Sequence, residues 1–97
     1  MNKFDEIKNK IVGVIVAVFP TAKVYLFGSR ARHTHNDRSD IDIAIDVGQK
    51  VDRIKVGEIR DMLNASHIPY KIDIVDIHNV NEAMKTSILR DGILWKE

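Results

Sequence analysis

Two aspartates interrupt an aliphatic run of this chain. Asp40 and Asp42 stand one residue apart, and ten residues separate Asp40 from the pair Gly28-Ser29, which follows another apolar run. Alternate side chains of a strand share a face, so the two carboxylates should lie on one side, with Cα atoms about 7 Å apart. Carboxylates at that separation can converge on one or two cations. The pattern predicts a divalent-cation site beside a phosphate-binding loop.

A third carboxylate, Asp73, stands in a later aliphatic run. Ile72 and Ile74 belong to one face of that run and Asp73 to the other. If the aliphatic faces pack on helices, Asp73 points the same way as Asp40 and Asp42. Three neighbouring carboxylates raise one another's pKa values, and a bound cation removes that cost. Oxygen ligands favour Mg²⁺, with Mn²⁺ as an alternative, over zinc. We expect these three aspartates to be catalytic and to bind two metal ions.

The loop before the aspartates carries the groups that anions need. Gly28 permits close backbone approach, and Ser29 offers a hydroxyl and an N–H to phosphate oxygens. Arg30 and Arg32 add positive charge, so we expect all four residues to bind a nucleotide. Phosphate beside paired cations indicates phosphoryl or nucleotidyl transfer, in which one carboxylate also helps to deprotonate the nucleophile.

Helices and strands alternate along the chain in the order α-β-β-α-β-α. Apolar residues at spacings of three and four predict a helix before Pro20, a second over 52–64 and a third after residue 79. Strands are expected over 23–27, 39–47 and 70–77, and residues 93–95 form an apolar tail or edge strand. The fold class is α+β, with two layers: a small mixed sheet with helices packed on one face. We expect Ile54, Ile59, Met62 and Leu63 to point inward, and Asn79 to cap the third helix.

Composition limits the class of protein. The 97 residues predict one domain, 1–97, and 15 Lys and Arg against 14 Asp and Glu argue against binding of a long nucleic acid. The longest apolar stretch is too short to span a bilayer, and no export signal is recognisable. The chain has no cysteine, which fits a cytoplasmic protein.

The arrangement Gly28-Ser29, ten residues, Asp40-Ile41-Asp42 resembles the signature of the DNA polymerase β-like nucleotidyltransferase superfamily, with Asp73 as its third carboxylate. The small size and the Gly-Ser-Arg-Ala-Arg opening are similar to the minimal nucleotidyltransferases of bacteria and archaea. The resemblance implies a nucleotidyltransferase fold, with Asp40 and Asp42 binding both metals. It further implies Asp73 binding the catalytic metal and Gly28 and Ser29 at the triphosphate of ATP.

The resemblance also implies a partner. Minimal nucleotidyltransferases are commonly encoded beside a helical HEPN-domain ribonuclease toxin and act as its antitoxin, and some transfer AMP from ATP to a toxin tyrosine. Such a protein is a protein adenylyltransferase that forms a hetero-oligomer with its toxin. One residue departs from the family pattern: His33 stands where a glycine is usual. If that position needs a positive φ, histidine costs on the order of 1 kcal/mol there.

Two other functions remain open. In the first, the chain is a non-catalytic antitoxin that neutralises its partner by steric contact. In the second, it transfers a nucleotide to a small molecule. Other polar residues receive structural interpretations: Asp46 is a solvent-exposed strand end, Asp76 has the wrong parity for the site, and His78 lies on the surface.

Overall fold

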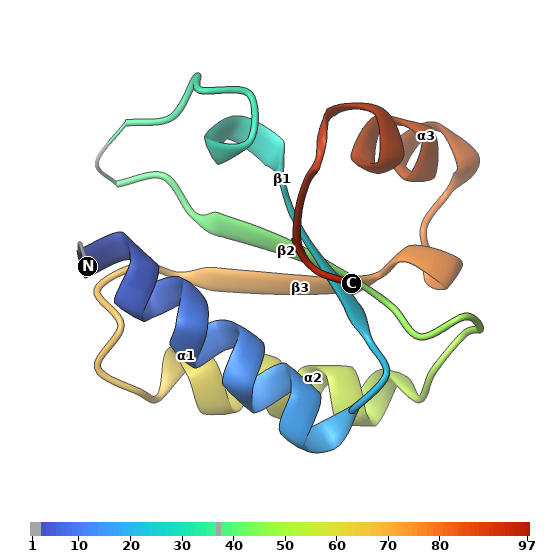
Figure 1. Cartoon of the computed structure of the whole chain (residues 1–97), viewed down its shortest axis with the longest axis horizontal. Coiled ribbons are helices and arrows are strands. Elements are labelled where there is room, and N and C mark those ends of the chain that lie inside the picture. Colours follow the sequence, from blue (N-terminus) through green and yellow to red (C-terminus); the bar gives the residue numbers. More distant parts are fainter. Residues whose placement is uncertain (1–2, 37) are drawn as a thin grey trace.

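A four-stranded mixed sheet forms the centre of the protein. The computed structural model describes residues 3–36 and 38–97 (Figure 1). The strand order is β3-β2-β1-β4; β2 and β3 run parallel, whereas β1 is antiparallel to both β2 and β4. The strands are β1 (Lys23–Phe27), β2 (Ile41–Asp46), β3 (Ile72–Asp76) and β4 (Ile93–Lys96). The mixed sheet agrees with the prediction, and the apolar tail is an edge strand.

Three helices pack on the sheet. They are α1 (Lys3–Val18), α2 (Arg53–Asn64) and α3 (Glu82–Asp91). Short 3-10 turns, Gly28–Arg30 and Ile77–Asn79, follow β1 and β3 directly. The part of the chain that the structure describes contains no helix with the length and hydropathy of a membrane span.

The main core lies between the sheet and the pair α1 and α2, which cover the same face (Figure 1). Ile11 and Ile15 of α1 are fully buried, because their spacing of four residues places them on one side of the helix. On this face, every second residue of β1, β2 and β3 is buried: Val24, Leu26, Ile41, Ile43, Ile45, Ile72 and Ile74. Alternation therefore turns the residues between them, Asp42 and Asp73 included, to the opposite face.

α3 lies on that opposite face, so the prediction that all helices pack on one face is wrong for this helix (Figure 1). Ile88 of α3 packs with Ala44 and Ile77 in a second, smaller apolar cluster, beside the half-buried Tyr25 and Phe27. The face that carries the aspartates is thus partly covered by a helix. Ile88 is the buried residue of α3, because the cluster beneath the helix is small.

Two local predictions are also wrong. Ile54 and Met62 of α2 are 70% and 54% exposed, and Val56 is buried instead. α2 packs mainly on the edge strand β3, so its core-facing stripe is narrow and follows Val56, Ile59 and Leu63. The cap of α3 is not Asn79 but Asn81, whose side chain accepts a hydrogen bond from the Met84 N–H.

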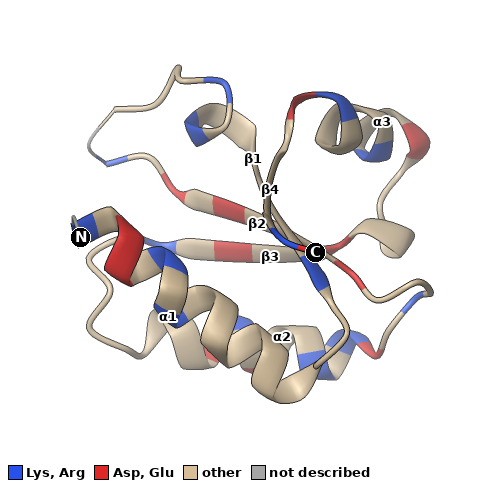
Figure 2. Ribbon diagram, viewed as in Figure 1, with Lys and Arg blue, Asp and Glu red and all other residues tan. Residues whose placement is uncertain are grey.

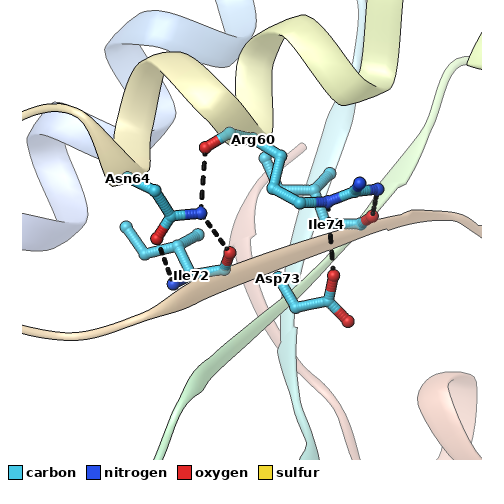
Figure 3. A network of polar contacts seen from close by, with 5 residues as sticks. All are labelled: Arg60, Asn64, Ile72, Asp73 and Ile74. Atoms are coloured by element: carbon cyan, nitrogen blue, oxygen red, sulfur yellow. Dashed lines mark hydrogen bonds and ion pairs between the residues drawn. The ribbon is translucent and has the colours of Figure 1, made fainter. Parts of the chain in front are cut away.

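Side chains of α2 cover the free edge of β3 (Figure 3). The Asn64 amide accepts a hydrogen bond from the Ile72 N–H at 2.9 Å and donates one to the Ile72 carbonyl at 2.9 Å. One turn earlier, Arg60 donates to the Ile74 carbonyl at 3.1 Å. An edge strand otherwise presents unpaired backbone groups to other chains. Asn64 therefore acts here in place of a neighbouring strand.

We expect Asn64→Ala to lower the free energy of unfolding by about 1–2 kcal/mol, because two backbone groups of Ile72 lose their partners. Urea unfolding measures the change. Lys71→Ala, at an exposed position next to Ile72, is the control and should have an effect below about 0.5 kcal/mol. Equal effects of the two substitutions would contradict the role of Asn64 at this edge.

Candidate active site

Asp42 and Asp73 lie side by side on two neighbouring strands. They are register partners in the parallel pair β2–β3, which places their Cα atoms about 4.8 Å apart. Figure 2 shows the acidic segments of β2 and β3 side by side. Asp40 is exposed and comes just before β2, which begins at Ile41 rather than at residue 39. The sheet therefore brings two of the predicted carboxylates together and places the third at the entrance of the same strand.

Burial and neighbouring negative charges raise the pKa of Asp42. Burial of its carboxyl contributes most, followed by the negative charges of Asp73 and Asp40, and Arg32 opposes these effects. The direction of this pKa shift agrees with the repulsion expected from three neighbouring carboxylates. A cation at this position would relieve the repulsion.

Gly28 packs directly against the Asp42 carboxylate. Its φ is +74°, which favours glycine, and a Cβ atom built on it would overlap the carboxylate of Asp42. The strand register explains the proximity, because Phe27 is the partner of Asp42 and Gly28 follows it at once. The Gly-Ser turn and the carboxylates thus form one site. Ser29 is half-buried beside them.

The predicted arginines differ in their surroundings. Arg30 is only 7% exposed, and its guanidinium donates to the Ser39 carbonyl at 3.1 and 3.2 Å. The same guanidinium lies 4.5 Å from the Tyr70 ring centre and 5.5 Å from that of Phe4. Arg30 therefore connects the two ends of the loop, and its contact with a nucleotide stays a prediction. Arg32 is exposed and acts on Asp42 through its charge.

His33 has a positive φ, as expected for a position where the family usually has glycine. Its φ is +59°, and among the described residues it is the only one other than glycine with a positive φ. A side chain in this region costs about 1–2 kcal/mol relative to the right-handed region, although histidine is among the more tolerant residues. The loop keeps the glycine geometry at that energetic cost.

Arg60 is a site residue that the sequence analysis did not identify (Figure 3). Its Nε lies 3.4 Å from an Asp73 oxygen, and this nitrogen is buried without a hydrogen-bond partner. The two side chains are 40% and 48% exposed, so the ion pair is weak. Its position four residues before Asn64, on the same side of α2, is the signal that could have indicated contact with β3.

The donor set fits a hard divalent cation. The available ligands are carboxylate oxygens, and the pKa of Asp42 is raised by burial first and by the neighbouring negative charges second. Within the described residues, no three His, Asp or Glu side chains are already gathered around a common point. Asp73 is turned toward Arg60, so a rotation of this half-exposed side chain is needed to bring it to Asp42.

A second polar cluster lies at the other end of β2. Asp46 accepts hydrogen bonds from Gly48 N–H at 2.8 Å and from His78 Nε2 at 2.7 Å. Burial acts to raise the pKa of Asp46, but these hydrogen bonds outweigh it and lower the pKa. Asp46 and His78 are therefore not merely exposed, contrary to the prediction. Asp76 is buried and accepts backbone N–H groups of Val51 and His78, which confirms its structural role.

Comparison with known proteins settles the family. Residues 9–97 match the model of the family described as "Polymerase beta, Nucleotidyltransferase". The chain belongs to this nucleotidyltransferase family. The resemblance inferred from Gly28, Ser29, Asp40 and Asp42 is thereby confirmed, as is the predicted nucleotidyltransferase fold with its small mixed sheet.

Similar proteins include an adenylyltransferase and toxin complexes. The protein adenylyltransferase MntA of Shewanella oneidensis is 31% identical over 90 residues, which are 91% of this chain but only 64% of that protein. A relative from Methanocaldococcus jannaschii is 28% identical over 94 residues and is covered to 95% of its length. The nucleotidyltransferase therefore spans about two thirds of MntA and nearly all of the archaeal protein.

Solved structures agree with the fold. A toxin-antitoxin crystal structure with AMP-PNP superposes with a TM-score of 0.79 at 29% identity, over 91% of this chain and 71% of that chain. The antitoxin in a complex with a tri-AMPylated HEPN toxin of Shewanella oneidensis gives a TM-score of 0.75 at 26% identity, over 94% and 70%.

We expect Asp42→Asn to stabilise the metal-free protein by about 0.5–1 kcal/mol at neutral pH, because it removes a crowded charge from a half-buried site. Because the pKa is raised in the folded state, ionised Asp42 lowers the stability of the protein. This destabilisation is complete above the folded-state pKa and absent below the ordinary aspartate pKa of about 3.9. Thermal unfolding without divalent cations, measured from pH 3 to 8, should show the gain growing with pH.

Asp46→Asn on the same strand is the matched control. The pKa of Asp46 is lowered, so its stabilising contribution is present above the ordinary aspartate pKa and is lost as pH falls through the folded-state value. This substitution should destabilise the protein at neutral pH. A stabilising Asp46→Asn or a destabilising Asp42→Asn would contradict the assigned electrostatics.

We expect His33→Gly to raise the free energy of unfolding by about 0.5–1 kcal/mol, because glycine adopts the positive φ without steric cost. Chemical denaturation measures the change. His35→Gly, in the same loop at an ordinary φ, should give no gain. A similar stabilisation by both substitutions would show that the loop as a whole, rather than the backbone at residue 33, is responsible.

Proposed function

We propose that this nucleotidyltransferase transfers AMP from ATP to a hydroxyl group of a partner protein in a Mg²⁺-dependent reaction. The observation that supports the proposal is the close approach of Gly28 to Asp42, with Asp73 in register on the neighbouring strand. This arrangement places a loop suited to phosphate directly beside paired carboxylates. Its chemistry is that of nucleotidyl transfer.

Each residue of the site has a distinct task in this proposal. The Gly28 backbone admits the triphosphate, and Ser29 donates its N–H and hydroxyl to phosphate oxygens. Asp40, Asp42 and Asp73 would hold two Mg²⁺ ions, which Mn²⁺ could replace. Such ions would supply positive charge that neutralises the negative charge on the attacking and leaving oxygens. Arg32 adds positive charge at the mouth of the site.

The transfer step involves one bond formed and one bond broken. The acceptor oxygen forms a bond to the α-phosphorus of ATP, and the bond from that phosphorus to the bridging oxygen of the β-phosphate breaks. Pyrophosphate leaves with the electron pair. Asp73, which lies at the outer strand, accepts the hydroxyl proton.

The relatives indicate the acceptor. A similar protein is named a protein adenylyltransferase, and a similar chain forms a complex with an AMPylated HEPN toxin. For this chain, we propose a HEPN ribonuclease toxin as partner, one of its tyrosines as acceptor, and antitoxin activity as the result. Residues 1–97 would act as one domain in the cytoplasm, where ATP is available, without binding long nucleic acids.

A second candidate is a non-catalytic antitoxin that neutralises its partner by contact alone. The strained backbone of His33, next to the phosphate loop, favours this alternative because the loop pays an energetic cost that the family's glycine avoids. Transfer to a small molecule is a third and weaker candidate, for which no residue in the site provides specific support.

Labelled ATP tests the activity. We expect wild-type protein with Mg²⁺ to label a HEPN toxin encoded beside it, and Asp42→Ala to reduce labelling by about 100-fold or more, because a cation ligand is lost. Asp46→Asn, on the same strand face but outside the site, should retain labelling if circular dichroism shows that it is folded. Chelation with EDTA should abolish the transfer.

Two outcomes would overturn the enzymatic proposal. Equal labelling by wild type and Asp42→Ala would exclude the carboxylates from the chemistry. Full neutralisation of the toxin in cells by Asp40→Ala, without labelled toxin, would favour the steric antitoxin.

A further inference from the structure

A groove of about 750 Å³ lies at the end of β3 formed by residues 74–76, beyond the part of the edge that Asn64 covers and outside the carboxylate site. Its walls are the first half of α2, the edge of β3 and residues 79–80. Three cationic residues, Lys50, Arg53 and Arg60, line it together with the apolar residues Ile74, Val75 and Val80. The proposed reaction assigns no role to this groove.

The charges of the groove favour an acidic ligand. Within the described residues, Lys50 and Arg53 have no ion-pair partner. The two carboxylates in the lining are already engaged with backbone: Asp52 accepts the Ile54 N–H, and Asp76 accepts those of Val51 and His78. The N-terminus of α2, which begins at residue 53, adds partial positive charge.

The backbone of β3 also favours an extended ligand. Asn64 binds both the N–H and the carbonyl of Ile72, so these groups point outward from the sheet. Backbone direction alternates along a strand, and the N–H of Ile74 therefore faces the groove. Arg60 donates to the Ile74 carbonyl, and a segment bound along this edge would pair with the outward-pointing Ile74 N–H.

The strand order gives the direction from which the acceptor arrives. The phosphate loop follows β1, Asp42 lies on the next strand, Asp73 on the outer strand β3, and the groove beyond it. In-line transfer requires the acceptor oxygen to approach opposite the leaving pyrophosphate. A triphosphate at Gly28 leaves the β3 side for the acceptor. Arg60 joins the two regions, because it contacts Asp73 and lines the groove.

We propose that the β3-edge groove binds an extended acidic segment of the acceptor protein, next to the hydroxyl that receives AMP. The inference rests on the proposed nucleotidyl transfer and specifies its substrate: a segment with one or two carboxylates for Lys50 and Arg53 and a small apolar side chain for Val75 and Val80. The groove thereby selects the acceptor, whereas the aspartates perform the chemistry.

Peptide binding tests the groove without ATP or Mg²⁺. The probes are two fluorescein-labelled peptides: one has two glutamates before a tyrosine and a valine after it, and the other has lysines in place of the glutamates. Fluorescence anisotropy should show at least tenfold tighter binding of the acidic peptide to the wild-type protein. Arg53→Glu should weaken this binding at least tenfold, and it should fold, because an acidic residue in the first turn of α2 is favourable.

Lys55→Glu is the matched control. It makes the same change of charge two residues along the same helix, at an exposed position outside the groove lining, and should alter peptide affinity less than twofold. Equal binding of the two peptides, no binding of either, or equal effects of Arg53→Glu and Lys55→Glu would overturn the inference. So would displacement of the acidic peptide by a single-stranded oligonucleotide in an Arg53-dependent manner, because the groove would then bind nucleic acid.

A separate measurement distinguishes failure of the inference from failure of the proposed function. Binding of an ATP analogue with Mg²⁺, followed by calorimetry, should be lost in Asp42→Ala and retained in Arg53→Glu. If the analogue binds but the acidic peptide does not, the groove inference alone fails. If the peptide binds in the groove but no nucleotide binds, the proposed transfer fails.

Discussion

The structure depends on carboxylates that repel one another and that the sheet nevertheless holds together. Asp42 and Asp73 are register partners on parallel strands, and Gly28 packs against the Asp42 carboxylate. The backbone of both strands is held at these positions, because the other face of each strand is packed in an aliphatic core. Binding of a cation and a triphosphate would turn this local cost into affinity, which is how stability and activity are commonly traded at functional sites.

The sheet separates stability from chemistry by its two faces. One face packs against α1 and α2 and supplies most of the buried apolar surface, whereas the other carries the aspartates and only a small cluster around Ile88. Strand alternation produces this division directly. A substitution on the site face is therefore expected to change function with little effect on the main core.

Two arginines define the borders of the site through structural contacts. Arg30 is buried between aromatic rings and the Ser39 carbonyl, so it fixes both ends of the loop that lies between the phosphate turn and Asp40. Arg60 reaches around the β3 edge from α2 to Asp73. Arg30 thus connects the ends of the loop, and Arg60 contacts the carboxylate of Asp73. Each guanidinium binds a backbone carbonyl, which makes its location independent of any ligand.

The sequence alone determined the family, the element order and the common face of Asp42 and Asp73, because strand periodicity and motif spacing are local properties. It also identified the position where His33 needs a positive φ. Only the tertiary structure decided that α3 lies on the site face, that Arg30 is buried and that Arg60 contacts Asp73. These facts depend on which elements meet in space: a polar side chain is read from the sequence as a ligand or a surface group until packing shows what surrounds it.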